Sequence, residues 1–152
     1  MTLDRRYWDS DCFLGWLQAE EGKVEACRQV LNHAAAGEIE IVTSALTIAE
    51  VLNLRGHPPL AADRKKQVID FFKRSYIVPV SITRRIAEDS RELVWDHGIK
   101  PKDALHVATA LYGNIELLNT FDEDLLKKSL TVGDPKLRIE LPQIDQPEFK
   151  GI

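Results

Sequence analysis

Short apolar segments alternate with amphipathic ones along most of this chain, and that alternation limits the fold more than any other feature. Strand-like segments separated by helix-like segments are typical of crossover connections in a mostly parallel sheet. We therefore predict an α/β fold in three layers (α/β/α), with helices on both faces of a central sheet of four to five strands. The strands are expected at residues 5–10, 39–43, 76–80 and 115–118, with an edge strand at 137–141.

Helices are expected between these strands, where apolar residues recur every three or four positions. Pro101 suits the first turn of a helix, and Gly37, Gly98 and Gly113 suit helix ends. In the helix at 62–74, Val68, Ile69, Phe71 and Phe72 are expected to face the core. The predicted helices cover residues 12–19, 23–36, 45–54, 62–74, 83–97, 101–112 and 122–128.

The length of 152 residues favours one compact domain over residues 1–152, with a core at about 5–140 and a C-terminal tail at 142–152. An apolar fraction of 44% and a charged fraction of 29% are ordinary for a globular protein. The net charge of −4 argues against a basic nucleic-acid coat protein. It does not exclude a nucleic-acid enzyme, because bound metal ions reverse the local field.

Neither a signal peptide nor an apolar run of membrane-spanning length is apparent, so no membrane partner is expected. The two cysteines, Cys12 and Cys27, follow no metal-ligand spacing and are interpreted as reduced, buried thiols. These features favour a cytoplasmic location.

Acidic residues stand at the ends of two predicted strands. Asp9 follows the first strand, and Asp122 follows the fourth. Ligands of open α/β sheets gather at the carboxyl ends of the strands, so both side chains reach one crevice if those strands are neighbours. Clustered carboxylates repel each other unless cations neutralise them. The pattern therefore predicts a divalent-metal site.

Two further acids lie in predicted helices, and each has a simpler interpretation. Glu50 is surrounded by apolar residues, and a buried glutamate needs a partner. It could instead belong to a surface stripe with Thr47 and either Asn53 or Leu54. Asp103 lies in the first turn of its helix, where it could simply stabilise the helix dipole.

The four acids and their neighbours, in this order, resemble the motifs of PIN-domain nucleases, and among them the VapC-type toxins. The resemblance covers about residues 5–140, and Asp11 departs from the small polar residue that the family usually has there. The segments that carry it are Tyr7-Trp8-Asp9-Ser10-Asp11, Thr47-Ile48-Ala49-Glu50-Val51-Leu52, Asp103-Ala104-Leu105-His106-Val107-Ala108-Thr109-Ala110 and Thr120-Phe121-Asp122.

The resemblance implies a PIN-like fold and a metal-dependent endoribonuclease, the toxin of a type II toxin–antitoxin pair. Its substrate would be RNA, an antitoxin would cover the site, and the chain would form a homodimer. Mg²⁺ or Mn²⁺ is the expected cofactor, because carboxylate oxygens suit these ions. The catalytic and metal-binding residues would be Asp9, Glu50, Asp103 and Asp122, with Asp9, Asp103 and either Glu50 or Asp122 as direct ligands.

Several neighbours of these acids have a supporting or an open role. Thr120, Ser10, Asp11 and Asp124 could support the site, although Asp124 also suits a helix cap. His106 is interpreted mainly as a packed helix histidine. Substrate contact is expected from positively charged side chains close to the acids, namely Lys100, Lys102, Arg84 and Arg85.

Two other functions fit parts of the sequence. Asp9-Ser10-Asp11 and Gly133-Asp134 resemble motifs of haloacid-dehalogenase-like phosphatases, but the Gly-Thr pair that usually follows the first motif is absent. A PIN-like fold could also be kept as a binding module without catalysis. Binding of Mn²⁺ would separate a nuclease from that module.

Overall fold

The computed structural model describes residues 3–54 and 56–144. Helices and strands alternate along it, as the sequence predicts. The elements are β1 (Asp4–Trp8), α1 (Ser10–Leu17), α2 (Val24–Ala35), β2 (Ile39–Ser44), α3 (Ala45–Glu50), the 3₁₀ helix η1 (Ala62–Arg64), α4 (Lys65–Phe72), β3 (Ile77–Val80), α5 (Arg84–His97), α6 (Pro101–Tyr112), β4 (Leu117–Asn119), α7 (Glu123–Leu126) and β5 (Arg138–Glu140).

The five strands form one parallel sheet in the order β3-β2-β1-β4-β5. The chain lays down β1, β2 and β3 in one direction and then returns to place β4 on the free side of β1. Tyr7 pairs with Leu118 in that register. The reversal makes the carboxyl ends of β1 and β4 the switch point of the sheet, the usual position of a ligand site. The condition on which Asp9 and Asp122 were expected to share a crevice, that the first and fourth strands are neighbours, is therefore met.

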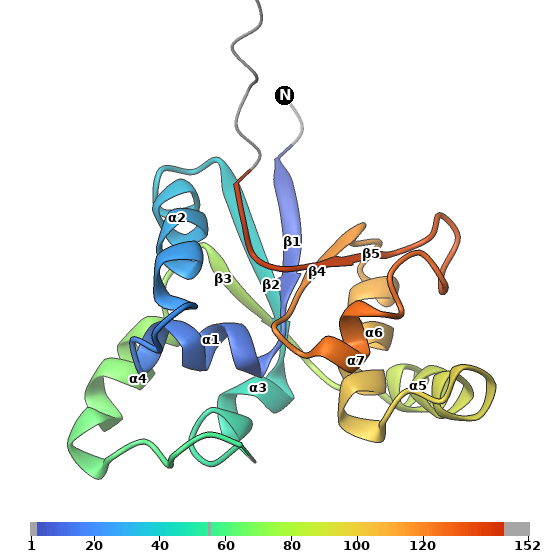
Figure 1. Ribbon diagram of the computed structural model, residues 1–152, viewed down its shortest axis with the longest axis horizontal. Helices are drawn as coiled ribbons and strands as arrows, with labels where there is room; N and C mark the ends of the chain where they lie inside the picture. The colour runs from blue at the N-terminus through green and yellow to red at the C-terminus, as the bar shows by residue number, and fades with distance from the viewer. Residues whose placement is uncertain (1–2, 55, 145–152) are drawn as a thin grey trace, which may run out of the picture.

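Helices cover both faces of the sheet, because successive side chains of a strand point to opposite faces. Tyr7, Val42 and Leu118 pack into a core with α5 and α6. Trp8 and Ile41 pack into a second core with α1, α2 and α4. Figure 1 shows α1, α2 and α4 on one side of the sheet and α5, α6 and α7 on the other. This confirms the three-layer prediction.

Several predicted boundaries and faces were wrong. The helix expected at 45–54 ends at Glu50, and residues 51–53 form turns and a bend. Ile69 was expected in the core, but 43% of its surface is exposed, because Val68, Phe71 and the partly buried Phe72 form the inward side of α4. The strand expected at 115–118 is shifted to Leu117–Asn119.

The start of the predicted tail packs against the sheet. Gln143 offers its backbone oxygen to Arg6 Nη1 at 2.8 Å, and Ile144 packs beside the core of the α1–α2 face. The rest of that tail, residues 145–152, lies outside the described residues. Among the residues described, no helix combines the length and apolarity that crossing a bilayer requires.

Candidate active site

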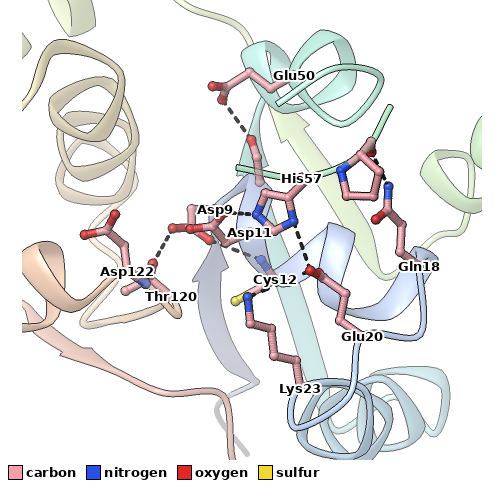
Figure 2. A network of polar contacts seen from close by, with 12 residues as sticks. Asp9, Asp11, Cys12, Gln18, Glu20, Lys23, Glu50, His57, Thr120 and Asp122 are labelled. Atoms are coloured by element: carbon pink, nitrogen blue, oxygen red, sulfur yellow. Dashed lines mark hydrogen bonds and ion pairs between the residues drawn. The ribbon is translucent and has the colours of Figure 1, made fainter. Parts of the chain in front are cut away.

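Asp9 and Thr120 meet at the switch point of the sheet. Asp9 follows β1 and is the N-cap of α1, where its Oδ1 accepts a hydrogen bond from Cys12 N at 3.2 Å. Thr120 follows β4 and donates from its hydroxyl to Asp9 Oδ2 at 2.5 Å. Both side chains are buried. The pairing of β1 with β4 thus holds the Asp9 carboxylate from two sides (Figure 2).

Glu50 points into the molecule from the last turn of α3. It is 7% exposed, and Thr47 on the same side of the helix is fully buried. The apolar side chains of Ile48 and Leu52 are 44% and 51% exposed instead. The surface stripe considered for Thr47 and Glu50 is therefore wrong, because the polar side of this helix faces the interior.

Three side chains supply the partners that a buried Glu50 needs. Glu50 Oε1 accepts a hydrogen bond from Ser10 Oγ at 2.8 Å and lies 2.9 Å from His106 Nε2. Lys102 Nζ lies 4.0 Å from Oε2. Burial pushes the pKa of Glu50 upward, but His106, Ser10 and Lys102 outweigh it and leave that pKa below its ordinary value. Glu50 is therefore held as a carboxylate.

His106 joins Glu50 to Tyr7 in one hydrogen-bonded chain. Tyr7 Oη lies 2.6 Å from His106 Nδ1, and both residues are buried. Burial and the nearby charge of Asp9 raise the pKa of Tyr7 well above its ordinary value, so its hydroxyl keeps its proton. The Tyr7 hydroxyl then donates to Nδ1, and Nε2–H donates to Glu50. His106 is packed, as predicted, and it also orients an acid of the site.

The four acids singled out from the sequence line one pocket of about 430 Å³, which we call the acidic pocket. Two lysines, a histidine and further polar residues line it as well. Its full lining is Asp9, Ser10, Asp11, Glu50, Leu54, Lys100, Pro101, Lys102, Asp103, His106 and Asp122.

The carboxyls of the acidic pocket repel one another. Burial, followed by the charge of Asp11, raises the pKa of Asp9 to about 7. Burial, followed by the charge of Asp122, raises the pKa of Asp103 to about 6. Burial and like charge together therefore oppose ionisation of Asp9 up to about pH 7 and of Asp103 up to about pH 6. A cation in the pocket would relieve the repulsion.

Asp122, and not Asp124, caps the short helix α7. Asp122 Oδ1 accepts from Leu125 N at 2.8 Å, and its backbone N–H donates to Thr120 Oγ1 at 3.0 Å. Asp124 lies within α7 and is 3.9 Å from Lys100 Nζ, so its interpretation as the cap was wrong. Thr120 thereby links Asp9 to the backbone of Asp122.

The basic residues expected to contact substrate divide into two pairs. Lys100 and Lys102 line the acidic pocket. Arg84 and Arg85 begin α5, form ion pairs with Glu88 and Asp89 and are absent from the lining of that pocket.

His57 is a part of this neighbourhood that sequence reasoning missed. Its Nε2 lies 2.9 Å from Asp11 Oδ1, and its Nδ1 lies 3.1 Å from Glu20 Oε1 (Figure 2). Its side chain is only 7% exposed. No sequence signal indicates this contact, because His57 lies in a loop 46 positions from Asp11. The loop after α3 is thereby joined to the rim of the acidic pocket.

The donors of the acidic pocket suit a hard divalent cation, since they are mainly carboxylate and hydroxyl oxygens. Within residues 3–54 and 56–144, no three Asp, Glu, His or Cys side chains stand close enough to hold an ion as they are. Oxygens of Asp9 and Glu50 are engaged by Thr120, Ser10 and His106. Binding an ion therefore requires side-chain rotation, which the repulsion of Asp9 by Asp11 and of Asp103 by Asp122 favours.

Gly133-Asp134, the second motif of the phosphatase alternative, lies elsewhere. Both residues line a separate cavity with Leu111 and Pro135 and are absent from the lining of the acidic pocket. Asp134 therefore does not join Asp9 in one site.

Comparison with known proteins gives one family and several similar folds. The model of the PIN domain family matches residues 6–129. VapC20 from Mycobacterium tuberculosis, described as a sarcin-ricin loop cleaving toxin, aligns with a TM-score of 0.62 at 16% identity, over 78% of this chain and 91% of that chain. VapBC2 from Rickettsia felis, bound to a DNA fragment from its promoter, aligns with a TM-score of 0.62 at 15% identity, over 90% of this chain and 98% of that chain. FitAcB from Neisseria gonorrhoeae aligns with a TM-score of 0.58 at 17% identity, over 90% of this chain and 97% of that chain. No curated protein matches this chain.

Proposed function

This chain belongs to the PIN domain family, and from that membership we propose that it is an endoribonuclease that hydrolyses phosphodiester bonds with Mg²⁺ or Mn²⁺. The observation that carries the proposal is that Asp9, Glu50, Asp103 and Asp122, from four separate segments, line one pocket at the switch point of the sheet. Such a concentration of carboxylates is costly to a fold without a cation to offset it.

Asp9, Asp103 and either Glu50 or Asp122 would hold the metal, and the remaining acid would orient the attacking water. When bound, the ion would polarise the phosphoryl oxygen and lower the pKa of the water. Thr120 fixes the Asp9 carboxylate, and Ser10 and His106 fix that of Glu50. Once the side chains have turned to hold an ion, groups with such partners would need little further rearrangement during the reaction, which is the main source of catalysis in preorganised polar sites.

Lys100 and Lys102 are the proposed contacts of the RNA phosphates. Both line the acidic pocket beside Asp103. A lysine ammonium offers a phosphate a point charge and three donors. Arg84 and Arg85 are the weaker candidates, because Glu88 and Asp89 already partly neutralise them.

The test is cleavage of RNA by the purified protein with Mg²⁺ or Mn²⁺. Asp9→Asn and Asp103→Asn should each lower the rate at least about a hundredfold, the scale of losing an essential group in a preorganised site. Asp70→Asn is the matched control, because Asp70 lies on α4 and pairs with Lys66. Equal activity of all four proteins would show that the cleavage comes from a contaminant or another site.

A binding module that keeps the fold without catalysis is the second candidate. It is favoured by the finding that no three potential ligands among the described residues stand ready to hold an ion. A thermal melt with Mn²⁺ separates the two, because an ion that binds only the folded state raises Tm. A Tm unchanged by Mn²⁺, together with absent cleavage, would favour the binding module.

We further propose that the chain is the toxin of a type II toxin–antitoxin pair, that it acts as a homodimer and that it is cytoplasmic. A solved complex with a similar fold is described as a toxin–antitoxin complex from Klebsiella pneumoniae. The exposed apolar side chains of Ile48, Leu52 and Ile69 offer surfaces for a second copy and for an antitoxin. Co-purification with the product of a neighbouring small gene is the test, and failure of that product to block cleavage would contradict the pairing.

A further inference from the structure

A second cavity, of about 580 Å³, adjoins the acidic pocket, and Lys100 and Asp103 line both. We call it the lysine cavity, because Lys100 precedes α6 while Lys127 and Lys128 follow α7. Its volume lies within the range of about 300–1,000 Å³ that is typical of small-ligand sites. Its full lining is Asp96, His97, Gly98, Ile99, Lys100, Asp103, Asp124, Leu125, Lys127, Lys128 and Thr131.

The charge of the lysine cavity differs from that of the acidic pocket. The acidic pocket has five carboxylates and only two lysines in its lining. The lysine cavity has three of each, and one of its three acids is Asp103, a proposed metal ligand. An ion on Asp103 would leave the lysines of this cavity in excess. A phosphate would then meet a favourable field on leaving the acidic pocket toward α7.

The three lysines are held to different degrees. Lys128 is partly buried, and its Nζ donates to the backbone oxygen of His97 at 2.7 Å. Lys100 is exposed and lies 3.9 Å from Asp124. Lys127 is exposed, and its ammonium makes no hydrogen bond or ion pair with any other described residue. Lys127 therefore has a charge that is not yet neutralised by the fold.

We propose that the lysine cavity binds the nucleotide next to the scissile phosphate of a single RNA strand, with Lys127 contacting its phosphate. Ile99 and Leu125 also line this cavity, but they are only 4% and 2% exposed, so its accessible contacts are mainly charged and polar and suit the sugar-phosphate backbone. A positively charged groove that follows the backbone is typical of single-strand binding. The continuity of the two cavities favours RNA over a protein ligand, because a strand seated in one leads into the other. This inference rests on the proposed ribonuclease function.

Binding of a fluorescent single-stranded RNA of about twelve nucleotides tests the inference. Every protein carries Asp9→Asn to prevent cleavage, Mn²⁺ is kept in saturating excess over this weakened site, and the dissociation constant is measured between about 50 and 200 mM NaCl. Adding Lys127→Ala should weaken binding on the order of threefold to tenfold and lower the salt slope by about 0.7, the value of one phosphate contact on a single strand. Lys127→Arg should restore both quantities, because it keeps the charge.

Lys73→Ala is the matched control. Lys73 is an exposed lysine at the end of α4. Helix α4 contacts the edge strand β3, whereas α7, which Lys127 follows, contacts the opposite edge strand β5, so Lys73 lies on the other side of the sheet from the lysine cavity. Equal losses in Lys73→Ala and Lys127→Ala would overturn the subsite while leaving RNA binding intact. So would a Lys127→Ala defect in antitoxin binding with unchanged RNA binding. Absence of RNA cleavage by the protein with Asp9 intact would instead contradict the proposed function itself.

Discussion

Asp9 combines full hydrogen bonding with unfavourable electrostatics. Its two oxygens accept from Cys12 N and the Thr120 hydroxyl, yet burial and the charge of Asp11 raise its pKa to about 7. A carboxyl whose folded-state pKa lies above the unfolded value of about 3.8 costs stability whenever it is ionised. Its favourable contribution is complete below about pH 4 and is lost as the pH rises through about 7.

Asp9→Asn should therefore stabilise the metal-free protein at pH 8, because the amide keeps an acceptor for Cys12 N and carries no charge. We expect Tm to rise by at least about 2 °C, the shift that roughly 1 kcal/mol produces in a chain of this length. The gain should shrink toward pH 4. Calorimetry in EDTA at both pH values gives the comparison, and a variant less stable than the parent at pH 8 would contradict the assigned repulsion.

Thr120 is fully buried and uses its hydroxyl as both donor and acceptor. Thr120→Val keeps the shape and leaves Asp9 Oδ2 and Asp122 N without this partner. The expected loss is about 1–3 kcal/mol of unfolding free energy, together with a lower cleavage rate. Thr120→Ser keeps the hydroxyl and should retain most of the unfolding free energy and most of the cleavage rate. Denaturant unfolding distinguishes them, and identical losses would mean that the methyl group, and not the hydroxyl, matters.

The acids of the site could be chosen from sequence because each lies at a strand end or a helix position that a motif marks. The side chains that hold these acids in place could not all be identified from the sequence. Tyr7 reaches His106 across 99 positions, and His57 reaches Asp11 across 46. No periodicity or spacing reports such contacts, because they arise only when the layers pack together.

Helix α3 shows where local pattern and tertiary packing disagree. The apolar residues at 45–54 predict burial, yet Ile48 and, in the turn after the helix, Leu52 face outward, while Thr47 and Glu50 face inward. Thr47 pairs with Thr43 of β2, and Glu50 pairs with His106 of α6, so partners on neighbouring elements decide which side is buried. The helix ends early, before a segment with a glycine and two prolines at 56–59 that cannot continue it.

The loop after α3 depends on His57. This side chain bridges Asp11 of α1 and Glu20, and Glu20 Oε2 is buried with no hydrogen-bond partner among the described residues. His57→Ala should lower stability by about 1–3 kcal/mol and speed amide exchange at Gly56 and Leu60, because two carboxylates lose their shared partner. His33→Ala is the control, since the His33 side chain is 42% exposed and its one polar partner within the described part of the chain is Glu38. Unchanged exchange in that loop would show that other contacts hold it.

The layered α/β architecture can be predicted from the sequence more securely than the order of the strands or the contacts between layers. Alternating strand and helix patterns, with apolar residues on successive positions of β1 and β2, require a sheet covered on both faces. The order of the strands in the sheet could not be predicted from the sequence. That order brings Asp9 to Thr120, because the chain returns to place β4 on the free side of β1. The acidic pocket is therefore a product of topology as much as of motif.

The proposed homodimer is a property of the whole surface. Ile48 of α3 and Leu52 of the turn after it are candidates for the interface because roughly half of each residue is exposed. Leu52→Asp should convert a dimer to a monomer in light scattering, because a charge would be buried without a partner. Leu130→Asp controls for surface charge, since Leu130 is 59% exposed beyond α7. A monomeric parent, or a dimer unaffected by Leu52→Asp, would contradict this interface.

Titration with Mn²⁺ by calorimetry tests most directly whether the four distant acids form one metal site. The parent protein should bind the ion. Asp9→Asn, Asp103→Asn and either Glu50→Gln or Asp122→Asn should each weaken binding about tenfold or more, the effect expected for groups that ligate or position an ion. Asp124→Asn should not, because Asp124 lines only the neighbouring lysine cavity. Absence of binding by the parent, or equal affinity in all the variants, would contradict the metal site and the nuclease chemistry that depends on it.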